Sequence, residues 1–399
     1  MFSKRTQKGR RAPRAAAVLL VFSLCFCAFF ITETSRAAVH EEYSPFVFES
    51  GLVYKVNGSG EAALVASEKN ISAADVCGSV SLGEKTYAVT SVASGAFANR
   101  TDLVSVTLPD TVKAVGDRAF FGCTALESVK AGGLEKVGVE AFTGAPFVCD
   151  DEFEILGKVL LRYNGDKEVV RVPSGVSYIA DAFSYNASAV TVIVPEGVLA
   201  VGDGAFAMAE SLENVSLPFS LETIGDSAFF GCVSLESVSV CSNVREIGSN
   251  AFSGTPYMGA LTEVGGDFLI LGGGVLVKYM GTDADVTVPR GVKYISDAFA
   301  YDQYVESVTL PESVESVGEG AFECSSLRRV IFEGNVSEIG DRAFKGCSSL
   351  RCTVFDKDAP TYIGERAFSG LSHAFAVYYS EGSSGFEIFD EIKVPAFGS

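Results

Sequence analysis

Eleven copies of the dipeptide Ala-Phe recur at near-regular spacing through this chain, most of them 22 to 24 residues apart. Val or Ile usually stands five residues before the Phe, with Gly after it, and apolar residues fall six, nine and eleven residues beyond the Phe. A unit this short cannot bury its own apolar face, so it must stack on its neighbours, and the repeat predicts a solenoid. The phenylalanines are Phe97, Phe120, Phe142, Phe183, Phe206, Phe229, Phe252, Phe299, Phe322, Phe344 and Phe368.

Each part of the unit has a physical interpretation. The apolar residues nine and eleven positions after the Phe, such as Val106 and Leu108, alternate as in a strand with one buried face. Pro109 then ends the strand without the loss of a ladder donor. The Gly permits a tight corner. The Ala-Phe segment is predicted to be a short turn or helical piece whose ring fills the coil, and neighbouring strands should form a parallel sheet.

Two intervals are longer than the others, 41 residues before Phe183 and 47 residues before Phe299. Residues 153–165 in the first interval match residues 268–281 in the second, and a fainter copy lies at residues 46–58. Each copy has apolar runs on both sides of a Gly turn, which predicts a β-hairpin.

Three super-units follow from this pattern, each consisting of a hairpin and the three or four repeats after it. The predicted boundaries are residues 1–37 for a signal peptide, 38–150, 151–265 and 266–370 for the three super-units, and 371–399 for a C-terminal cap or tail. The first super-unit holds the repeats of Phe97, Phe120 and Phe142, the second those of Phe183, Phe206, Phe229 and Phe252, and the third those of Phe299, Phe322, Phe344 and Phe368.

The unit L-x-x-V-x-L-P-x-x-V-x-x-[VI]-G-x-x-A-F-x-G-C closely resembles that of the BspA-like leucine-rich repeat proteins. The resemblance covers the repeats from about Leu103 to Gly370, and begins near Phe46 if the hairpins are included. It implies a right-handed leucine-rich-repeat solenoid, mainly β with short helical turns and a parallel sheet, here with inserted hairpins. It also implies a bacterial or protist surface protein that adheres to host matrix or to other cells. The family offers no catalytic residues to carry over.

The start of the chain has the order of a secretory signal peptide. Basic residues between Lys4 and Arg14 precede an apolar stretch at residues 15–31, and Ala37 and Ala38 form a small-residue exit where cleavage is expected. An uncleaved membrane anchor is the alternative, because the apolar stretch approaches the roughly 18 residues that suggest a span. We therefore expect a secreted or cell-surface protein with no membrane span in the mature chain.

Charge and composition exclude several function classes. Cleavage after residue 37 would leave 24 basic and 49 acidic residues, a net charge of −25, which disfavours nucleic acid as a partner. The mature chain has only His40 and His373 and no Trp, which weakens His-based catalysis and classical zinc sites. Ser227 lies in a protease-like G-D-S-A stretch, but other repeats carry G-D-G-A and G-D-R-A in the same slot. The sequence therefore predicts no enzyme, no cofactor and no metal site.

Eight cysteines lie outside the predicted signal peptide. Cys123, Cys232 and Cys347 each follow a repeat Phe by three residues, so they occupy equivalent places in stacked coils, and buried thiols are favoured there. The alternative is a disulfide between Cys232 and Cys241, or between Cys347 and Cys352, because an exported chain can form disulfides.

Two surfaces are candidates for binding a protein or glycan ligand on host matrix or other cells. Outward strand positions carry short hydroxyl side chains, as at Ser105 and Thr107, which form a smooth face for an extended partner. The hairpins offer larger anchors, because Tyr and Arg are common in binding hot spots. These partner-binding candidates are Arg162, Tyr163, Lys278, Tyr279, Tyr54 and Lys55.

Two alternatives compete with this interpretation. The hairpin tyrosines could instead pack on the flank of the solenoid. The whole chain could instead be a structural spacer or envelope-layer subunit that self-associates through its exposed sheet ends or flanks.

Overall fold

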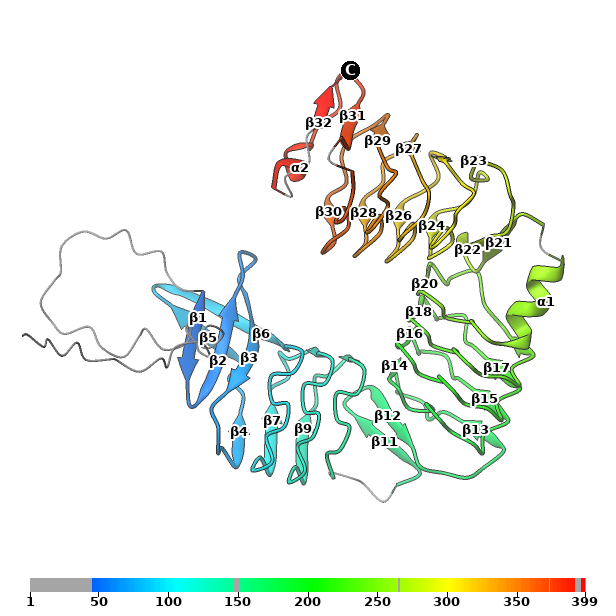
Figure 1. Ribbon diagram of the computed structural model, residues 1–399. Helices are drawn as coiled ribbons and strands as arrows, with labels where there is room; N and C mark the ends of the chain where they lie inside the picture. Colours follow the sequence, from blue (N-terminus) through cyan, green and yellow to red (C-terminus); the bar gives the residue numbers. More distant parts are fainter. Residues whose placement is uncertain (1–44, 147–150, 265, 373, 392–395, 399) are drawn as a thin grey trace, which may run out of the picture. The chain divides into compact units, whose positions relative to one another are not determined.

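A computed structural model describes residues 45–146, 151–264, 266–372, 374–391 and 396–398. Residues 45–399 form one compact unit, a β-solenoid of about 14 turns with parallel sheets and very little helix (Figure 1). The predicted signal peptide, His40, Cys149 and His373 lie outside the described residues. No helix within the described ranges has the length and apolar character needed to cross a bilayer.

The strands that precede the repeat proline form three parallel sheets, which we call the pre-proline sheets. Their outward and inward residues alternate as predicted: Val106 and Leu108 are buried, whereas Thr107 is exposed. The first sheet contains β4 (Ala73–Asp75), β7 (Ser105–Leu108) and β9 (Ser128–Ala131). The second contains β13 (Val169–Arg171), β15 (Thr191–Ile193), β17 (Asn214–Ser216) and β19 (Ser237–Val238). The third contains β23 (Asp285–Thr287), β25 (Ser307–Leu310), β27 (Arg329–Phe332), β29 (Cys352–Phe355), β31 (Ala376–Tyr379) and β32 (Ala396–Gly398).

A second set of strands, which the sequence analysis missed, precedes the repeat glycine and forms the pre-glycine sheets. Most of these strands have two residues, an outward one and an inward Val or Ile. The first sheet contains β1 (Phe46–Glu49), β2 (Leu52–Val56), β3 (Glu61–Ser67), β6 (Lys85–Val92), β8 (Ala114–Val115) and β10 (Lys136–Val137), with β5 (Ser79–Leu82) paired to β6. The second contains β11 (Phe153–Leu156), β12 (Val159–Tyr163), β14 (Tyr178–Ile179), β16 (Ala200–Val201), β18 (Thr223–Ile224) and β20 (Glu246–Ile247). The third contains β21 (Phe268–Leu271), β22 (Val275–Tyr279), β24 (Tyr294–Ile295), β26 (Ser316–Val317), β28 (Glu338–Ile339) and β30 (Tyr362–Ile363).

The three predicted hairpins are confirmed, and they begin the pre-glycine sheets. β1 pairs antiparallel with β2, β11 with β12, and β21 with β22. The second strand of the latter two hairpins then pairs in parallel with the first two-residue strand of its super-unit. These two hairpins therefore convert an antiparallel start into a parallel stack, whereas in the first super-unit β2 pairs antiparallel with β3 and the parallel stack begins with β3 and β6.

The repeat phenylalanines form the centre of each coil, as predicted. Phe229 is fully buried between Phe206 and Phe252, with ring centroids 4.9 and 5.2 Å away and nearly parallel planes. The Ala-Phe segments are turns with no helical piece. Each of these turns carries a residue at positive φ two positions after the Phe, and most carry another two positions before it. Gly or Asn occupies most of the later positions, because positive φ is less costly for these residues.

The buried apolar residues fall into three clusters. One extends from Leu52 to Ala145, the next from Leu160 to Phe252, and the last from Leu276 to Phe389, with a few residues from each following hairpin joining the cluster before it. The predicted super-unit boundaries stay a prediction, since contacts also cross between clusters.

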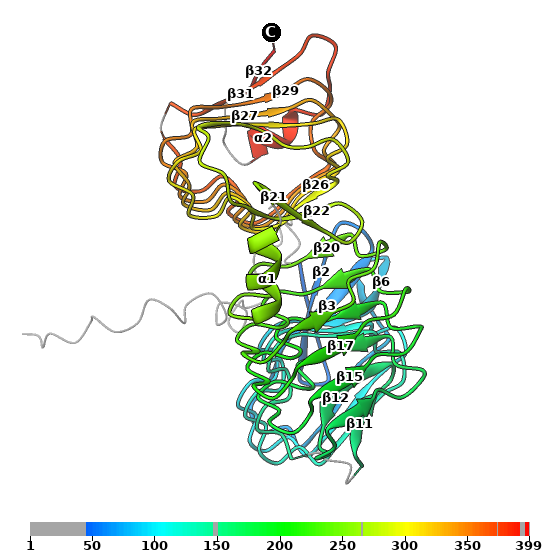
Figure 2. The same ribbon diagram turned by 90° about the vertical axis from the view of Figure 1, so that its right-hand side faces the viewer.

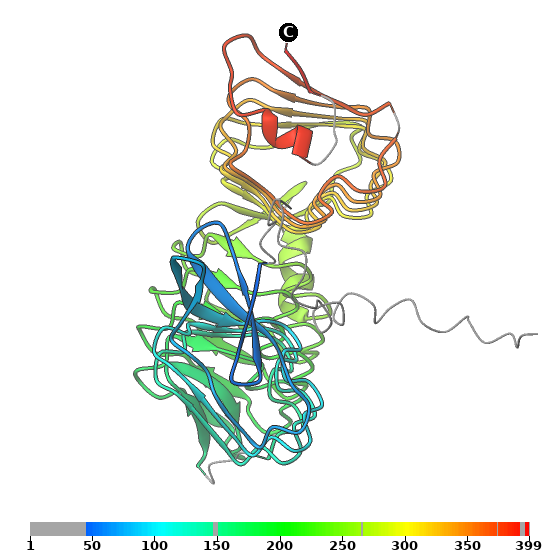
Figure 3. The ribbon, with the colours of Figure 1, turned by 90° about the vertical axis from the view of Figure 1, so that its left-hand side faces the viewer.

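Two short helices cover coil ends. α1 (Pro256–Val264) follows the coil of Phe252, and Tyr257 at its start packs edge-on against that ring at 5.3 Å. α2 (Glu387–Glu391) lies across the open end of the last coils (Figures 2 and 3). Its Phe389 is buried against Phe355 and Phe368, so this helix closes the apolar interior of the third super-unit.

The prediction of buried thiols is confirmed. Cys123, Cys232 and Cys347 are free and fully buried. Each Sγ donates a hydrogen bond to the carbonyl oxygen of the repeat Phe one coil earlier, as Cys232 does to Phe206 at 2.9 Å. Cys241 and Cys352 are also free, so neither alternative disulfide forms.

Candidate functional site

The hairpin tyrosines belong to the core, which corrects their prediction as partner contacts. Tyr54, Tyr163 and Tyr279 are all buried, with Tyr163 only 5% exposed. The ring of Tyr163 lies between Phe153 and Phe183 at 5.2 Å from each. Tyr279 occupies the equivalent place in the next super-unit, and the hydroxyl of Tyr54 accepts a hydrogen bond from a backbone amide. These side chains have no surface to offer a partner, and the flank-packing alternative holds for them.

The cations beside these tyrosines do reach the surface. Lys55, Arg162 and Lys278 are exposed. Arg162 lies 3.9 Å from the carboxylate of Glu154, which is almost fully buried. Burial raises the pKa of Glu154, and the charge of Arg162 offsets part of that rise. Their role in partner contact stays a prediction.

The outward face of the pre-proline sheets carries short polar side chains, as predicted. Thr107, Asn214, Ser216, Ser237 and Ser239 are exposed on this face. In the third sheet the face changes, because Arg329, Ile331 and Val354 stand in the outward positions.

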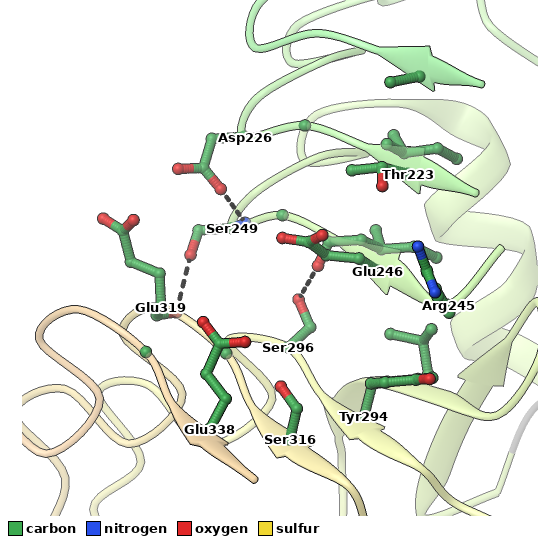
Figure 4. Close-up of a pocket in the computed structure, with 18 of the residues that line it drawn as sticks. Thr223, Asp226, Arg245, Glu246, Ser249, Tyr294, Ser296, Ser316, Glu319 and Glu338 are labelled. Atoms are coloured by element: carbon green, nitrogen blue, oxygen red, sulfur yellow. Dashed lines mark hydrogen bonds between the residues drawn. The ribbon is translucent and has the colours of Figure 1, made fainter. Parts of the chain in front are cut away.

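A groove of about 810 Å³ lies along the outward face of the pre-glycine sheets, where the second super-unit meets the third (Figure 4). It is lined by outward residues of strands from β10 to β30 and by the corners that follow several of these strands. The outward residues labelled in Figure 4 are Thr223, Glu246, Tyr294, Ser316 and Glu338, and Lys136, Tyr178, Ala200 and Tyr362 line the groove as well. No local sequence pattern indicates this groove, because the two-residue strands that form it show no alternation of their own.

Three hydrogen bonds fix the two sides of the groove to each other. The hydroxyl of Ser249 donates to the carbonyl oxygen of Glu319 at 3.2 Å, and the hydroxyl of Ser296 donates to the carbonyl oxygen of Ile247 at 2.6 Å. The backbone N–H of Asn250 donates to the carboxylate of Asp297 at 2.9 Å. Because the partners are separated by 47 to 70 residues, these bonds tie the last coil of one super-unit to the first coils of the next.

Carboxylates dominate the electrostatics of the groove. The carboxylate of Asp226 accepts the backbone N–H of Ser249 at 2.7 Å. Burial, reinforced by the nearby charge of Asp203, raises the pKa of Asp226 to about 6. Burial and the charge of Glu338 likewise raise the pKa of Glu246. Such shifts mean that the negative charge here is poorly solvated and not fully neutralised by the protein's own cations.

The groove also contains cationic and phenolic groups, and two of them are already engaged with a carboxylate. Arg245 pairs with Glu222 at 2.5 Å, and the hydroxyl of Tyr294 donates to Glu315 at 3.0 Å. In the part of the chain that the structure describes, no group of three or more His, Cys, Asp or Glu residues is placed to hold a metal ion. The arrangement suits the binding of a polar partner that brings its own hydrogen-bond donors and positive charge.

The repeats match a family model described as a BspA-type leucine-rich repeat region. The model matches in six copies over residues 79–153, 162–259 and 282–383, which is more than half of the chain. No curated protein matches the sequence significantly.

Several solved structures are similar to this chain. A leucine-rich cell surface protein from Faecalibacterium prausnitzii is 24% identical, with 90% of this chain and 95% of that chain covered and a TM-score of 0.34. A leucine-rich repeat protein from Bacteroides ovatus is 19% identical over 89% and 100% of the two chains, with a TM-score of 0.30. A leucine-rich repeat protein from T. pallidum is 22% identical over 55% and 95%, also with a TM-score of 0.30.

Proposed function

The chain belongs to the BspA-type leucine-rich repeat family, and on that premise we propose that it is an exported, non-catalytic protein that binds a protein partner at the cell surface. The groove along the pre-glycine sheets is the observation that carries the proposal. A repeat protein presents one side chain per coil along such a surface, so a partner can contact several coils at once.

The chemistry of the groove favours a polar, cationic segment of a protein over an apolar ligand. Asp226, Glu246 and Glu338 contribute carboxylates, and Thr223 and Ser316 contribute hydroxyl groups. Burial, and after it like-charge repulsion, raises the pKa values of Asp226 and Glu246, and a partner that brings Lys, Arg or backbone N–H groups would offset both effects. Adhesion to host matrix or to other cells would follow from such binding.

The exposed hairpin cations belong to the same proposal as secondary contacts. Arg162 and Lys278 occupy equivalent places in two hairpins and are both exposed. Lys55 is exposed in the first hairpin. Exposed charges of this kind act on association rate and on specificity more than on affinity.

A capture experiment with matched variants tests the groove. Protein with Glu246→Lys and Glu338→Lys should capture less surface material from host or neighbouring cells than the parent. Glu127→Lys with Glu236→Lys is the charge-matched control, because both residues are exposed and neither lines the groove. Equal capture by the parent and the groove variant would reject the groove. Loss of capture after glycosidase treatment of the surface material would point to a glycan ligand instead of a protein.

Export has its own test. N-terminal sequencing of the exported protein should begin at Ala38 or Val39, and an intact Met1 on that form would favour the membrane-anchor alternative.

One observation favours the competing function, a self-associating spacer. β1 is an edge strand of the first pre-glycine sheet, and its Phe48 is 73% exposed. Edge strands with exposed apolar side chains are templates for pairing with a second chain. Sedimentation at increasing protein concentration separates the two functions, since a spacer should grow into larger species and a monomeric binding protein should not.

A further inference from the structure

Two exposed tyrosines, three residues apart in the chain, lie on the corner that follows the coil of Phe299. Tyr301 is 65% exposed and Tyr304 is 68% exposed. Tyr301 also adopts a φ of 60°, which is uncommon for a large side chain. The corner lies along the chain between β24 and β25, and none of its residues lines the groove described above.

Hydrogen bonds hold this corner in one conformation. The carboxylate of Asp302 accepts the backbone N–H groups of Tyr304 and Val305, both at 2.8 Å. The side-chain amide of Gln303 donates to the carbonyl oxygens of Tyr301 and Cys324 at 3.1 and 3.2 Å. Both rings are therefore presented on a rigid segment, and little conformational entropy would be lost when a partner binds them.

The equivalent corner of the second super-unit shows what is particular to this one. Tyr185 stands where Tyr301 does and is 75% exposed, and Asn186 accepts the same two backbone N–H groups as Asp302. The second super-unit has Ser188 in place of Tyr304. The third super-unit thus adds one ring and one negative charge to the same backbone framework.

The charges around the two corners also differ. In the second super-unit Lys167 pairs with Glu152 at 2.6 Å. The equivalent positions in the third super-unit hold Asp283 and Asp267, two like charges. Both lie near the hydroxyl of Tyr279, whose pKa is raised by burial and then by the charges of Asp283, Asp267 and Asp302. Among the described residues, no cation forms an ion pair with any of these three carboxylates.

We propose that Tyr301 and Tyr304 form a second docking surface, and that its occupant is a basic segment of a partner protein. Lys or Arg side chains of that segment would lie against the two rings, since cations are attracted to the faces of aromatic rings. Neighbouring cations would pair with Asp267, Asp283 and Asp302, which lack the internal partner that Lys167 provides in the second super-unit. Charge complementarity thus selects a basic polypeptide.

Anisotropy of a fluorescein-labelled octalysine peptide, titrated with the purified protein at physiological salt, tests this proposal. The double variant Tyr301→Asn, Tyr304→Ser installs residues that the chain itself uses at equivalent places, Asn99 and Ser188, so the fold should be kept. We expect it to raise the Kd about tenfold through the loss of two ring contacts. Asp283→Lys, which places a cation where the second super-unit has Lys167, should raise the Kd by a similar factor of about ten, because it sets a like charge against the bound cations.

Matched controls decide between a defined surface and attraction to the net charge. Tyr185→Asn removes an equally exposed ring from the second super-unit, and Glu127→Lys makes the same charge change as Asp283→Lys on a distant exposed carboxylate. Each should change the Kd by less than about twofold, since isolated surface charges contribute little. Equal losses in the controls and the patch variants would overturn the proposal, as would a parent protein that does not bind octalysine.

The same titration separates this surface from the groove. Protein with Glu246→Lys and Glu338→Lys keeps Tyr301 and Tyr304, so its Kd for octalysine should rise less than that of the tyrosine double variant. A groove variant that abolishes octalysine binding while Tyr301→Asn, Tyr304→Ser has no effect would assign the basic partner to the groove and overturn the tyrosine surface.

Discussion

The ring of Tyr163 lies 5.2 Å from the ring of Phe183. A hairpin residue is therefore one layer of an aromatic column that continues through Phe206, Phe229 and Phe252. Tyr279 has the same relation to Phe299 in the third super-unit. The hairpins therefore contribute to the core, and a substitution of their tyrosines should be felt in stability.

Tyr163→Ser should lower the free energy of unfolding by about 3 kcal/mol, because it removes a buried ring from a packed column. It also removes the hydroxyl that accepts the backbone N–H of Lys167 at 3.1 Å. Denaturant titration followed by circular dichroism measures the loss. Tyr185→Ser is the control, since this side chain is exposed and its replacement should cost less than about 0.5 kcal/mol. A Tyr163→Ser protein as stable as the parent would contradict the column.

Phe229→Ala should lower the free energy of unfolding by roughly 3–5 kcal/mol, because the ring is fully buried and packs against the coil on each side. The adjacent Phe230 is 44% exposed, and Phe230→Ala should cost much less. The comparison uses the same residue type at consecutive positions, so the difference in unfolding midpoint reports on burial alone. A loss below about 1 kcal/mol at Phe229 would be inconsistent with central packing.

Glu154→Leu should raise the free energy of unfolding by about 1–3 kcal/mol, because a buried carboxylate with one distant cation costs more in desolvation than it gains in pairing. The chain supplies the precedent: Leu269 occupies the equivalent position in the next hairpin and is buried opposite Lys278, as Glu154 is opposite Arg162. Thermal unfolding checks the gain. Arg162→Ala should lower the free energy of unfolding, since it leaves the carboxylate without its cation. A Glu154→Leu protein less stable than the parent would contradict this prediction and show that the ion pair is net favourable.

Asp226→Asn should make the protein less sensitive to pH. The folded state holds a proton on Asp226 up to about pH 6, whereas an unfolded chain releases it near about pH 4. Stability contributed by this group is therefore present at low pH and lost as pH rises through that interval. The variant keeps an oxygen to accept the backbone N–H of Ser249. The free energy of unfolding of the variant should exceed that of the parent by on the order of 1–2 kcal/mol above about pH 6, and the two should be equal near about pH 4.

Asp203→Asn provides a second check on the same carboxyl group. Its charge is one of the causes that raise the pKa of Asp226, so its removal should move the pH dependence to lower pH. Unfolding midpoints measured across this pH range would contradict the assignment if neither variant altered the profile.

The sequence predicted the features that repeat or alternate within a few residues. β7 and the column of phenylalanines follow from spacing, and the thiols of Cys123, Cys232 and Cys347 follow from equivalence between coils. The pre-glycine strands were missed because two residues such as Ala114–Val115 show no alternation, and their pairing is with residues a full repeat away.

The prediction that the hairpin tyrosines contact a partner was wrong for a different reason. Successive residues of a strand point to opposite faces, so Arg162 and Tyr163 cannot both face a partner. The groove depends on contacts such as that between Ser249 and Glu319, which no local pattern encodes. The family resemblance gave no help with either, because it describes one coil and not the junction between two super-units.

Each hairpin supplies the first strand of a new pre-glycine sheet. A super-unit can therefore start its own sheet and does not need to extend the sheet of the coils before it. This makes the segment a natural module for gene duplication. A copied segment would start its own stack wherever it was inserted, and the chain could lengthen or shorten by whole modules without a change of register inside any of them. The aspartates in the first coils of the second and third modules, Asp181 and Asp297, each accept a backbone N–H from the module before, at Glu140 and Asn250. Such a junction needs only one acidic side chain and one main-chain amide, so an inserted module would need few specific residues to join the module beside it.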